Sequence, residues 1–219
     1  MTKDLSELDV DGVLCISLRP REDRRAALRE SFRSSGLDIE FFLVDKDVED
    51  PQRGCYDSHR AVARTALERQ YKRTLILEDD CVLTSFSHHT VPRINRFLRA
   101  DDPEIFYLGV LPGKIWLTWR PGISRCRGQG AHAYLISAQG CRKILAWEDY
   151  AGKGIDNFFS KRFKGYCVFP MICFQNDLVS DIQAYRQSVD SNHHPRMTDF
   201  ARKQYISALK NIHKTLLFR

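Results

Sequence analysis

The most informative stretch of the sequence is Leu75-Ile76-Leu77-Glu78-Asp79-Asp80, in which a strand-length apolar run ends in three consecutive carboxylates. Ligands of open α/β sheets gather beyond the carboxyl ends of the strands, so we expect these acids to face a binding crevice. Carboxylates this close repel one another unless a cation neutralises them. Hard oxygen ligands suit magnesium or manganese, ions that hold diphosphates. The stretch therefore predicts a divalent metal site, and capping of the following turn is the alternative.

Strand and helix patterns alternate on both sides of this stretch. The expected strands are 12–18, 39–45, 74–78, 105–109, 132–137 and 166–170, and the expected helices are 20–35, 56–70, 87–100, 138–147 and 155–163. Alternation in such short steps is typical of a right-handed, mostly parallel α/β sheet. We find no internal repeat and no linker. The sequence therefore predicts one α/β domain over residues 1–195, followed by a helical tail over residues 196–219.

The composition is that of an ordinary globular protein. Hydrophobic residues make up 43% and charged residues 28% of the 219, as in ordinary globular proteins. No apolar run approaches the roughly 18 residues of a membrane span, and the first residues lack a secretory pattern, so a cytoplasmic protein is predicted. The seven cysteines are odd in number and form no C-x-x-C pair, which favours reduced thiols over disulfides or structural zinc.

The net charge of +6 predicts an anionic partner. A nucleotide, an acidic lipid surface and nucleic acid all fit such a charge. Because no recognised nucleic-acid motif accompanies it, we expect no nucleic-acid partner.

A second motif, Gly54-Cys55-Tyr56-Asp57-Ser58-His59, stands where the helix 56–70 is expected to begin. Asp57 or Ser58 can cap the first turn, and a helix N-terminus favours anions, so a phosphate can bind here. Cys55 and His59 also permit a nucleophile with its base, although the sequence shows no third group to orient them. A structural role for His59 is the simpler alternative.

These motifs, taken in order, resemble glycosyltransferase family 25. The matching residues are Ile16-Ser17-Leu18-Arg19 with Arg24, Gly54-Cys55 with Ser58-His59, Leu75 to Asp80, Tyr134-Leu135-Ile136-Ser137 with Gly140, and Ile155-Asp156. The family usually carries Asn where this chain has Ser17. The resemblance spans about residues 13–175.

The resemblance implies an A-type glycosyltransferase fold, in which a nucleotide-binding sheet is flanked by helices. It also implies metal-dependent transfer of a hexose, with inversion, from a nucleotide sugar such as a UDP-sugar. The acceptor would be a hydroxyl of a glycolipid or polysaccharide precursor, as in lipopolysaccharide biosynthesis.

The resemblance further assigns roles to particular residues. Glu78 and Asp80 would hold manganese or magnesium, and Asp79 would contact ribose or sugar hydroxyls. The other donor-binding residues would be Ser17, Arg24, Asp45, Ser58 and His59.

An inverting transfer needs a base on the side opposite the leaving diphosphate, which excludes the acids that hold the metal. Asp156, which matches the family's late aspartate, is the predicted base. His132 and Asp181 are the reserve candidates. A helix-capping aspartate is the alternative interpretation of Asp156.

The segment 111–130 interrupts the alternation of strands and helices. It contains Pro112, Gly113, Pro121, Gly122, Gly128 and Gly130, together with Trp116 and Trp119. A long loop in a compact domain is usually functional. Glycines allow motion and indole faces suit sugar rings, so we expect an acceptor-side lid. The alternative is that both tryptophans belong to the core.

The tail carries Met197, Ala201, Tyr205, Leu209, Ile212 and Leu216 at helical spacing, with lysines and arginines nearby. A basic amphipathic helix can lie on an anionic membrane surface, which would make the protein peripheral to the inner face of the membrane. Packing of the stripe on the domain, or on a second subunit in a homodimer, is the alternative.

Two other classes of function compete with the enzyme. Receiver domains also place paired acids after an apolar strand to hold magnesium, but after the first strand of a domain of about half this length. A catalytically inactive binding protein with the same fold is the second alternative. The complete acidic triplet together with Asp156 argues for the enzyme.

Overall fold

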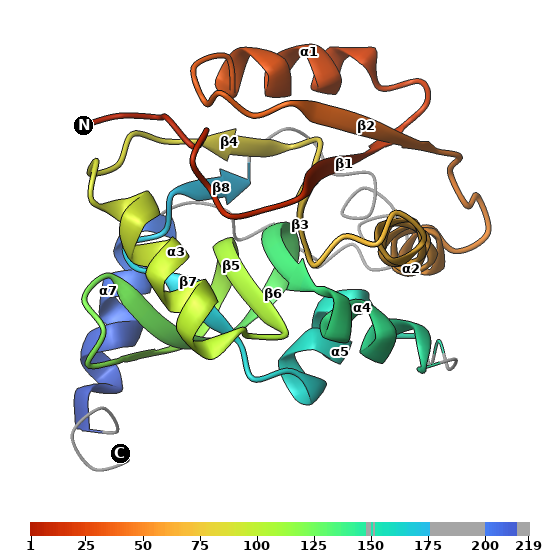
Figure 1. Cartoon of the computed structure of the whole chain (residues 1–219). Helices are drawn as coiled ribbons and strands as arrows, with labels where there is room; N and C mark the ends of the chain where they lie inside the picture. Colours follow the sequence, from red (N-terminus) through yellow and green to blue (C-terminus); the bar gives the residue numbers. More distant parts are fainter. Residues whose placement is uncertain (148–149, 151, 176–199, 214–219) are drawn as a thin grey trace.

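One mixed sheet organises the computed structural model, which describes residues 1–147, 150, 152–175 and 200–213 (Figure 1). The six strands lie in the order β2 (Ile39–Val44), β1 (Gly12–Leu18), β3 (Arg73–Glu78), β6 (Ile123–Ser137), β5 (Ile105–Leu117) and β7 (Tyr166–Val168). The first three strands are parallel to one another, and β5 is parallel to β7. Strand β6 runs antiparallel to β3, β5 and β7.

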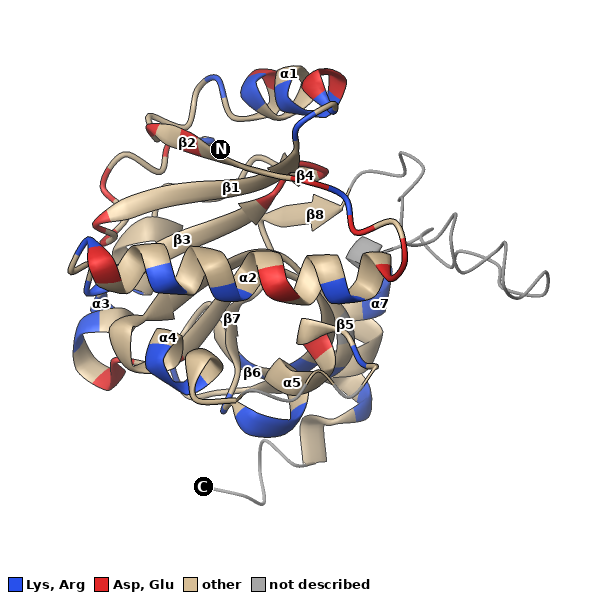
Figure 2. Cartoon of the chain, turned by 90° about the vertical axis from the view of Figure 1, so that its right-hand side faces the viewer, with Lys and Arg blue, Asp and Glu red and all other residues tan. Residues whose placement is uncertain are grey.

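Helices cover both faces of this sheet. The first face carries α1 (Glu22–Ser31) and α3 (Thr90–Asp101), together with a ribbon of β4 (Cys81–Leu83) and β8 (Cys173–Gln175). The second face carries α2 (Pro51–Glu68), α4 (Ala138–Leu145), α5 (Ile155–Arg162) and α7 (Phe200–Lys210). Figure 2 shows α2 lying across the sheet, with α4 and α5 below it. The expected α/β fold, a sheet flanked by helices, is confirmed.

The strands are apolar because they are covered on both sides. In β3, Leu75 and Leu77 belong to the core beneath α1 and α3, whereas Ile76 between them belongs to the core beneath α2 and α4. All three side chains are fully buried. Since neighbouring strand residues point to opposite faces, a strand buried on both faces reads as a continuous apolar run.

The predicted lid at 111–130 is wrong, because these residues form the far part of the β5–β6 hairpin. The two strands pair from Ile105 opposite Ile136 out to Leu117 opposite Ser124, with irregularities in the register. Gly113 and Gly128 are needed for close approach of the strands: an added Cβ would lie 2.5 Å from the partner strand's carbonyl oxygen at either position. These glycines let the strands meet and do not create a mobile loop.

Helix α2 begins five residues earlier than the sequence suggested, so the predicted cap at Asp57 or Ser58 is wrong. Asp50 is the N-cap: its carboxylate accepts hydrogen bonds from the amides of the second and third helical residues at 3.0 and 3.1 Å. Pro51 occupies the first helical position, where its missing N–H costs nothing. Gly54 to His59 therefore lie inside the helix, and no helix N-terminus offers a phosphate site at those residues.

Helix α7 docks on β5 through small and polar side chains. Gln204 accepts a hydrogen bond from the amide of Met171 at 2.9 Å, and the Ser207 hydroxyl accepts one from the amide of Ile115 at 3.0 Å. The predicted apolar stripe faces outward in its described part, because Tyr205, Leu209 and Ile212 are exposed. Met197, Leu216 and the reserve base Asp181 lie outside the described residues.

No helix in the described part of the chain is both long enough and apolar enough to cross a bilayer.

Candidate active site

A cavity opens where β1, β2 and β3 end, with the first turns of α2 as its wall. Parallel strands bring their carboxyl ends to the same edge of a sheet, which is why residues far apart in sequence meet there. Eight of the nine predicted site residues line this cavity: Ser17, Arg24, Asp45, Ser58, His59, Glu78, Asp79 and Asp80. The ninth, Asp156, does not. Lys46, Asp47, Cys55 and Gln175 also line the cavity, and none of them stood in the predicted set.

Asp79 is held by Ser17 and Arg24. The Ser17 hydroxyl donates to one carboxylate oxygen at 2.7 Å, and the Arg24 guanidinium contacts the other at 3.2 Å. The side chains of Arg24 and Asp79 are only 7% and 8% exposed. Burial raises the pKa of Asp79 above its usual value, although Ser17 and Arg24 act in the opposite direction. Ser17 and Arg24 thus occupy both carboxylate oxygens of Asp79.

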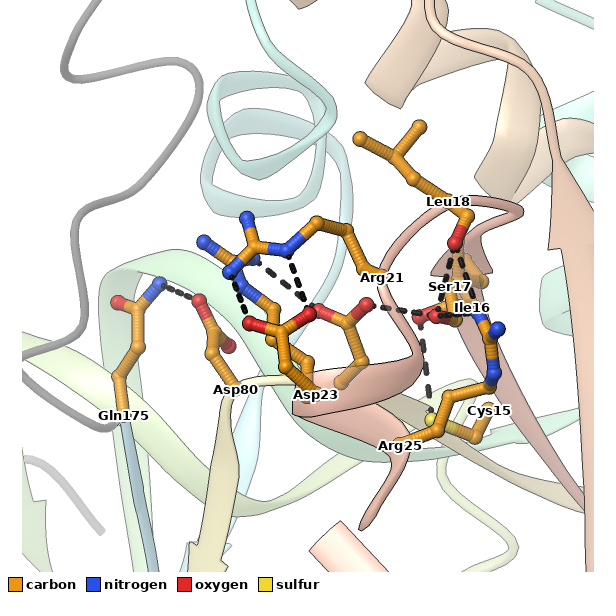
Figure 3. A network of polar contacts seen from close by, with 11 residues as sticks. Cys15, Ile16, Ser17, Leu18, Arg21, Asp23, Arg25, Asp80 and Gln175 are labelled. Carbon is orange, nitrogen blue, oxygen red and sulfur yellow. Dashed lines mark hydrogen bonds and ion pairs between the residues drawn. The ribbon is translucent and has the colours of Figure 1, made fainter. Parts of the chain in front are cut away.

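Arg25 fixes the turn that follows β1. Its guanidinium donates to the Ser17 hydroxyl at 3.1 Å and to the Leu18 carbonyl oxygen at 2.8 Å (Figure 3). It also donates to the Arg19 carbonyl oxygen at 2.9 Å. Ser17 thus links Arg25 to Asp79. These contacts tie the end of β1 to α1 and to Asp79.

Asp80 keeps one carboxylate oxygen without a partner. The Gln175 amide nitrogen donates to Oδ2 at 2.8 Å, which Figure 3 shows, whereas Oδ1 is buried and has no hydrogen-bond partner among the described residues. Burial raises the pKa of Asp80 to about 7, and the negative charge of Glu78 adds to this rise. The Gln175 hydrogen bond and the positive charge of Arg24 act in the opposite direction but do not outweigh these two effects.

Glu78 contacts a histidine whose ring is fixed on its other side. Its Oε1 lies 3.2 Å from His59 Nε2, and His59 Nδ1 lies 2.8 Å from the hydroxyl of Tyr134. Burial alone would raise the pKa of Glu78, but the hydrogen bond and the charge of His59 outweigh it, so the pKa is lowered. Ser58 has a local role: its hydroxyl donates to the Gly54 carbonyl oxygen at 2.6 Å.

The residues of the cavity fit the metal that the family resemblance implies. Glu78 and Asp80 supply hard carboxylate oxygens, and the unpartnered Oδ1 of Asp80 is the atom that a cation would satisfy. Asp79 is the exception among the three acids, because Arg24 neutralises it. Two of the three acids thus remain as candidate ligands.

Asp156 lies at the same edge of the sheet but outside the cavity. Its Oδ2 accepts a hydrogen bond from the amide of Gly130 at 3.0 Å, and its Oδ1 accepts one from the amide of Asn157 at 2.7 Å. It stands in the first turn of α5, whose N-cap is Gly154. Because Leu77 pairs with Ala133 in the antiparallel β3–β6 ladder, the β6 residues near Gly130 lie beyond the end of β3.

The reserve base His132 is buried next to Gly109. It is 2% exposed, and neither ring nitrogen has a hydrogen-bond partner among the described residues. A Cβ added to Gly109 would lie 2.6 Å from His132 Nε2, so only glycine leaves room for this ring. Burial lowers the pKa of His132, although the charge of Glu78 acts against the shift. Burial therefore favours the neutral form of His132.

Among curated proteins, the chain is similar to a relative whose name gives a family. A Drosophila melanogaster protein named "Glycosyltransferase 25 family member" is 26% identical in an alignment 177 residues long, and the match covers 64% of this chain. The resemblance to glycosyltransferase family 25 is confirmed. This chain spans 28% of the length of that relative. No protein-family model matches the chain.

Solved structures with a similar arrangement are distant in sequence. A197 from STIV is 12% identical with a TM-score of 0.48, over 78% of this chain and 87% of that one. A glycosyltransferase involved in glycosylation of the major capsid of PBCV-1 is 13% identical with a TM-score of 0.40, over 74% and 78% of the two chains.

Proposed function

We propose that the protein is a metal-dependent glycosyltransferase of the family 25 type, moving a hexose from a UDP-sugar to a hydroxyl of a glycolipid or polysaccharide precursor. One observation carries this proposal: eight residues predicted from the family motifs line a single cavity at the ends of three parallel strands. The similarity to a named family 25 member supports the same class of reaction.

In this proposal the donor's diphosphate lies between the C-terminal end of β3 and the first turns of α2. Glu78 and Asp80 would hold manganese or magnesium, which neutralises the charge that develops on the leaving diphosphate. Lys46, which also lines the cavity, adds a positive charge for the same anion. Ser17, Arg24 and Asp45 surround the nucleoside, and Asp79, held by Ser17 and Arg24, keeps that wall in place.

We propose Asp156 as the base that accepts the proton of the acceptor hydroxyl, with inversion at the anomeric carbon. Both of its oxygens accept backbone hydrogen bonds, which keep the carboxylate oriented. Its place beside β6, outside the cavity of Glu78 and Asp80, is compatible with the acceptor side of the reaction.

Asp156→Asn is expected to lower turnover roughly a hundredfold or more while UDP binding and the melting temperature change little, because asparagine keeps the shape but cannot take the proton. Turnover is followed as release of UDP in the presence of acceptor. Near wild-type turnover would remove Asp156 from the reaction. A large loss of stability with a modest loss of turnover would make its role structural.

We also propose that α7 contacts an anionic membrane, where glycolipid acceptors reside. Tyr205, Leu209 and Ile212 form an exposed apolar face, with Lys203 and Lys210 exposed on the same short helix. Such a helix binds anionic surfaces by combined apolar and electrostatic contacts. Leu209→Glu is expected to reduce cosedimentation with anionic vesicles several-fold. Unchanged cosedimentation, or loss of a dimer instead, would contradict membrane contact.

Calorimetry with UDP tests the donor site itself. We expect one UDP per chain, bound much more tightly with manganese than with a chelator present. Equal affinity with and without metal would contradict the metal-dependent site, and absence of binding would contradict the donor assignment.

A further inference from the structure

A second set of potential metal ligands lies in the wall of the cavity. Cys55 and His59 stand four residues apart on α2, and therefore on one side of the helix, and Glu78 ends β3 beside them. One ligand atom from each residue lies within 4.8 Å of the other two. In the part of the chain that the structure describes, no other set of three Cys, His, Asp or Glu side chains meets this criterion.

His59 has the orientation of a metal-binding histidine. Ligating imidazoles are usually held through their second ring nitrogen by an oxygen, which fixes the ring and leaves the first nitrogen for the metal. In this protein Nδ1 lies 2.8 Å from the Tyr134 hydroxyl, and Nε2 faces Glu78 Oε1 at 3.2 Å. His59 and Tyr134 are 1% and 0% exposed, so this arrangement is rigid.

The chemistry of the three donors differs from that of the Glu78–Asp80 pair. A thiolate, an imidazole and a carboxylate together suit zinc and similar ions, whereas carboxylates alone suit magnesium and manganese. Ligand atoms around tetrahedral zinc lie about 3.3 to 3.7 Å apart. The nitrogen and the carboxylate oxygen lie 3.2 Å apart, close to this separation, and the thiol sulfur lies within 4.8 Å of the other ligand atoms, so a movement of about 1 Å or less brings it into range. Three protein ligands leave a fourth position open.

We propose that Cys55, His59 and Glu78 form a binding site for zinc or an ion of similar chemistry, distinct from the manganese or magnesium site. The site shares Glu78 with the donor's metal site. Zinc would therefore withdraw Glu78 from the donor metal and inhibit transfer. Zinc binding itself does not depend on the transfer reaction, because the ligand set stands on its own geometry; only the inhibition rests on the proposed function.

Metal binding is measured on the full chain without nucleotide. We expect one zinc per chain by competition with a chromophoric chelator. Cobalt, used as a probe, should give the near-ultraviolet absorption band of a thiolate–cobalt bond. Cys55→Ser should abolish this band and weaken zinc binding roughly a hundredfold, because loss of a direct ligand costs at least as much as loss of its supporting partner. The paired replacement His88→Ala and His89→Ala, of two exposed adjacent imidazoles, is the matched control and should change neither result.

A second readout needs no variant of the site. All seven cysteines lie in the described part of the chain, and Cys55 alone among them is partly exposed. Iodoacetamide should therefore modify Cys55 first, and zinc should slow that modification at least tenfold. A wild-type protein without the cobalt–thiolate band, equal alkylation rates with and without zinc, or unchanged zinc affinity in folded Cys55→Ser would each overturn the proposal.

Discussion

Replacing Asp80 by alanine is expected to weaken manganese-supported UDP binding by roughly a hundredfold, because a metal at a phosphoryl oxygen contributes several kcal/mol. The unpartnered Oδ1 of Asp80 is the oxygen best placed to meet a cation. Glu78→Ala should act in the same direction but less severely, since Glu78 already has a polar partner in His59 whereas Oδ1 of Asp80 has none among the described residues. Calorimetric titration of UDP, with manganese and with a chelator, measures both effects.

Two further variants test whether the loss of UDP binding depends on the carboxylate of Asp80. Asp80→Asn preserves the shape of the side chain and should lose metal-supported binding as Asp80→Ala does. Asp57→Asn removes a carboxylate on the exposed side of α2 and should leave UDP binding unchanged. Wild-type metal-dependent affinity in folded Asp80→Ala would exclude Asp80 as a metal ligand.

Arg24→Ala is expected to cost about 3 to 5 kcal/mol of the free energy of unfolding, because it leaves the carboxylate of Asp79 buried without its cation. The ion pair is almost completely shielded, with side chains 7% and 8% exposed. Urea unfolding monitored by circular dichroism gives the difference. A second replacement, Asp79→Asn, in the same chain should recover part of the loss because it removes the unpaired charge.

Arg19→Ala supplies the matched control for Arg24. Arg19 pairs with Asp45 at 3.3 Å, but the two side chains are 58% and 83% exposed. Exposed pairs contribute about 0 to 1 kcal/mol, so this variant should be nearly as stable as the wild type. Equal losses for Arg24→Ala and Arg19→Ala would show that the Arg24–Asp79 pair does not anchor the wall of the cavity.

The sequence predicted the elements whose environment is regular. Strands buried on both faces, such as Leu75 to Glu78, appear as apolar runs, and their parallel pairing gathers the acids at one edge. The sequence does not predict the outer part of the β5–β6 hairpin, because glycines such as Gly113 and Gly128 are typical of loops. Their actual role, close approach to carbonyl oxygens of the partner strand, depends on contacts across the hairpin. The start of α2 could have been found from Asp50 followed by Pro51, a known N-terminal signal.

The site shows the same division between local and distant information. The family resemblance predicts eight residues that line the cavity. It does not predict the partners that set the charges of those residues. Gln175 reaches Asp80 from β8, ninety-five residues away, and no local pattern marks it. Likewise, the sequence shows no third group beside Cys55 and His59, whereas the structure brings Glu78, from the end of another element, close to both.

Release of UDP from a panel of UDP-hexoses, with manganese and with a chelator, distinguishes a metal-dependent transferase from a binding protein. We expect that the wild type slowly hydrolyses at least one UDP-hexose, that the chelator stops the reaction, and that Asp80→Asn is inactive under the same conditions. UDP binding without release from any UDP-hexose, even with glycan or glycolipid acceptors present, would exclude transfer and favour a binding protein with this fold.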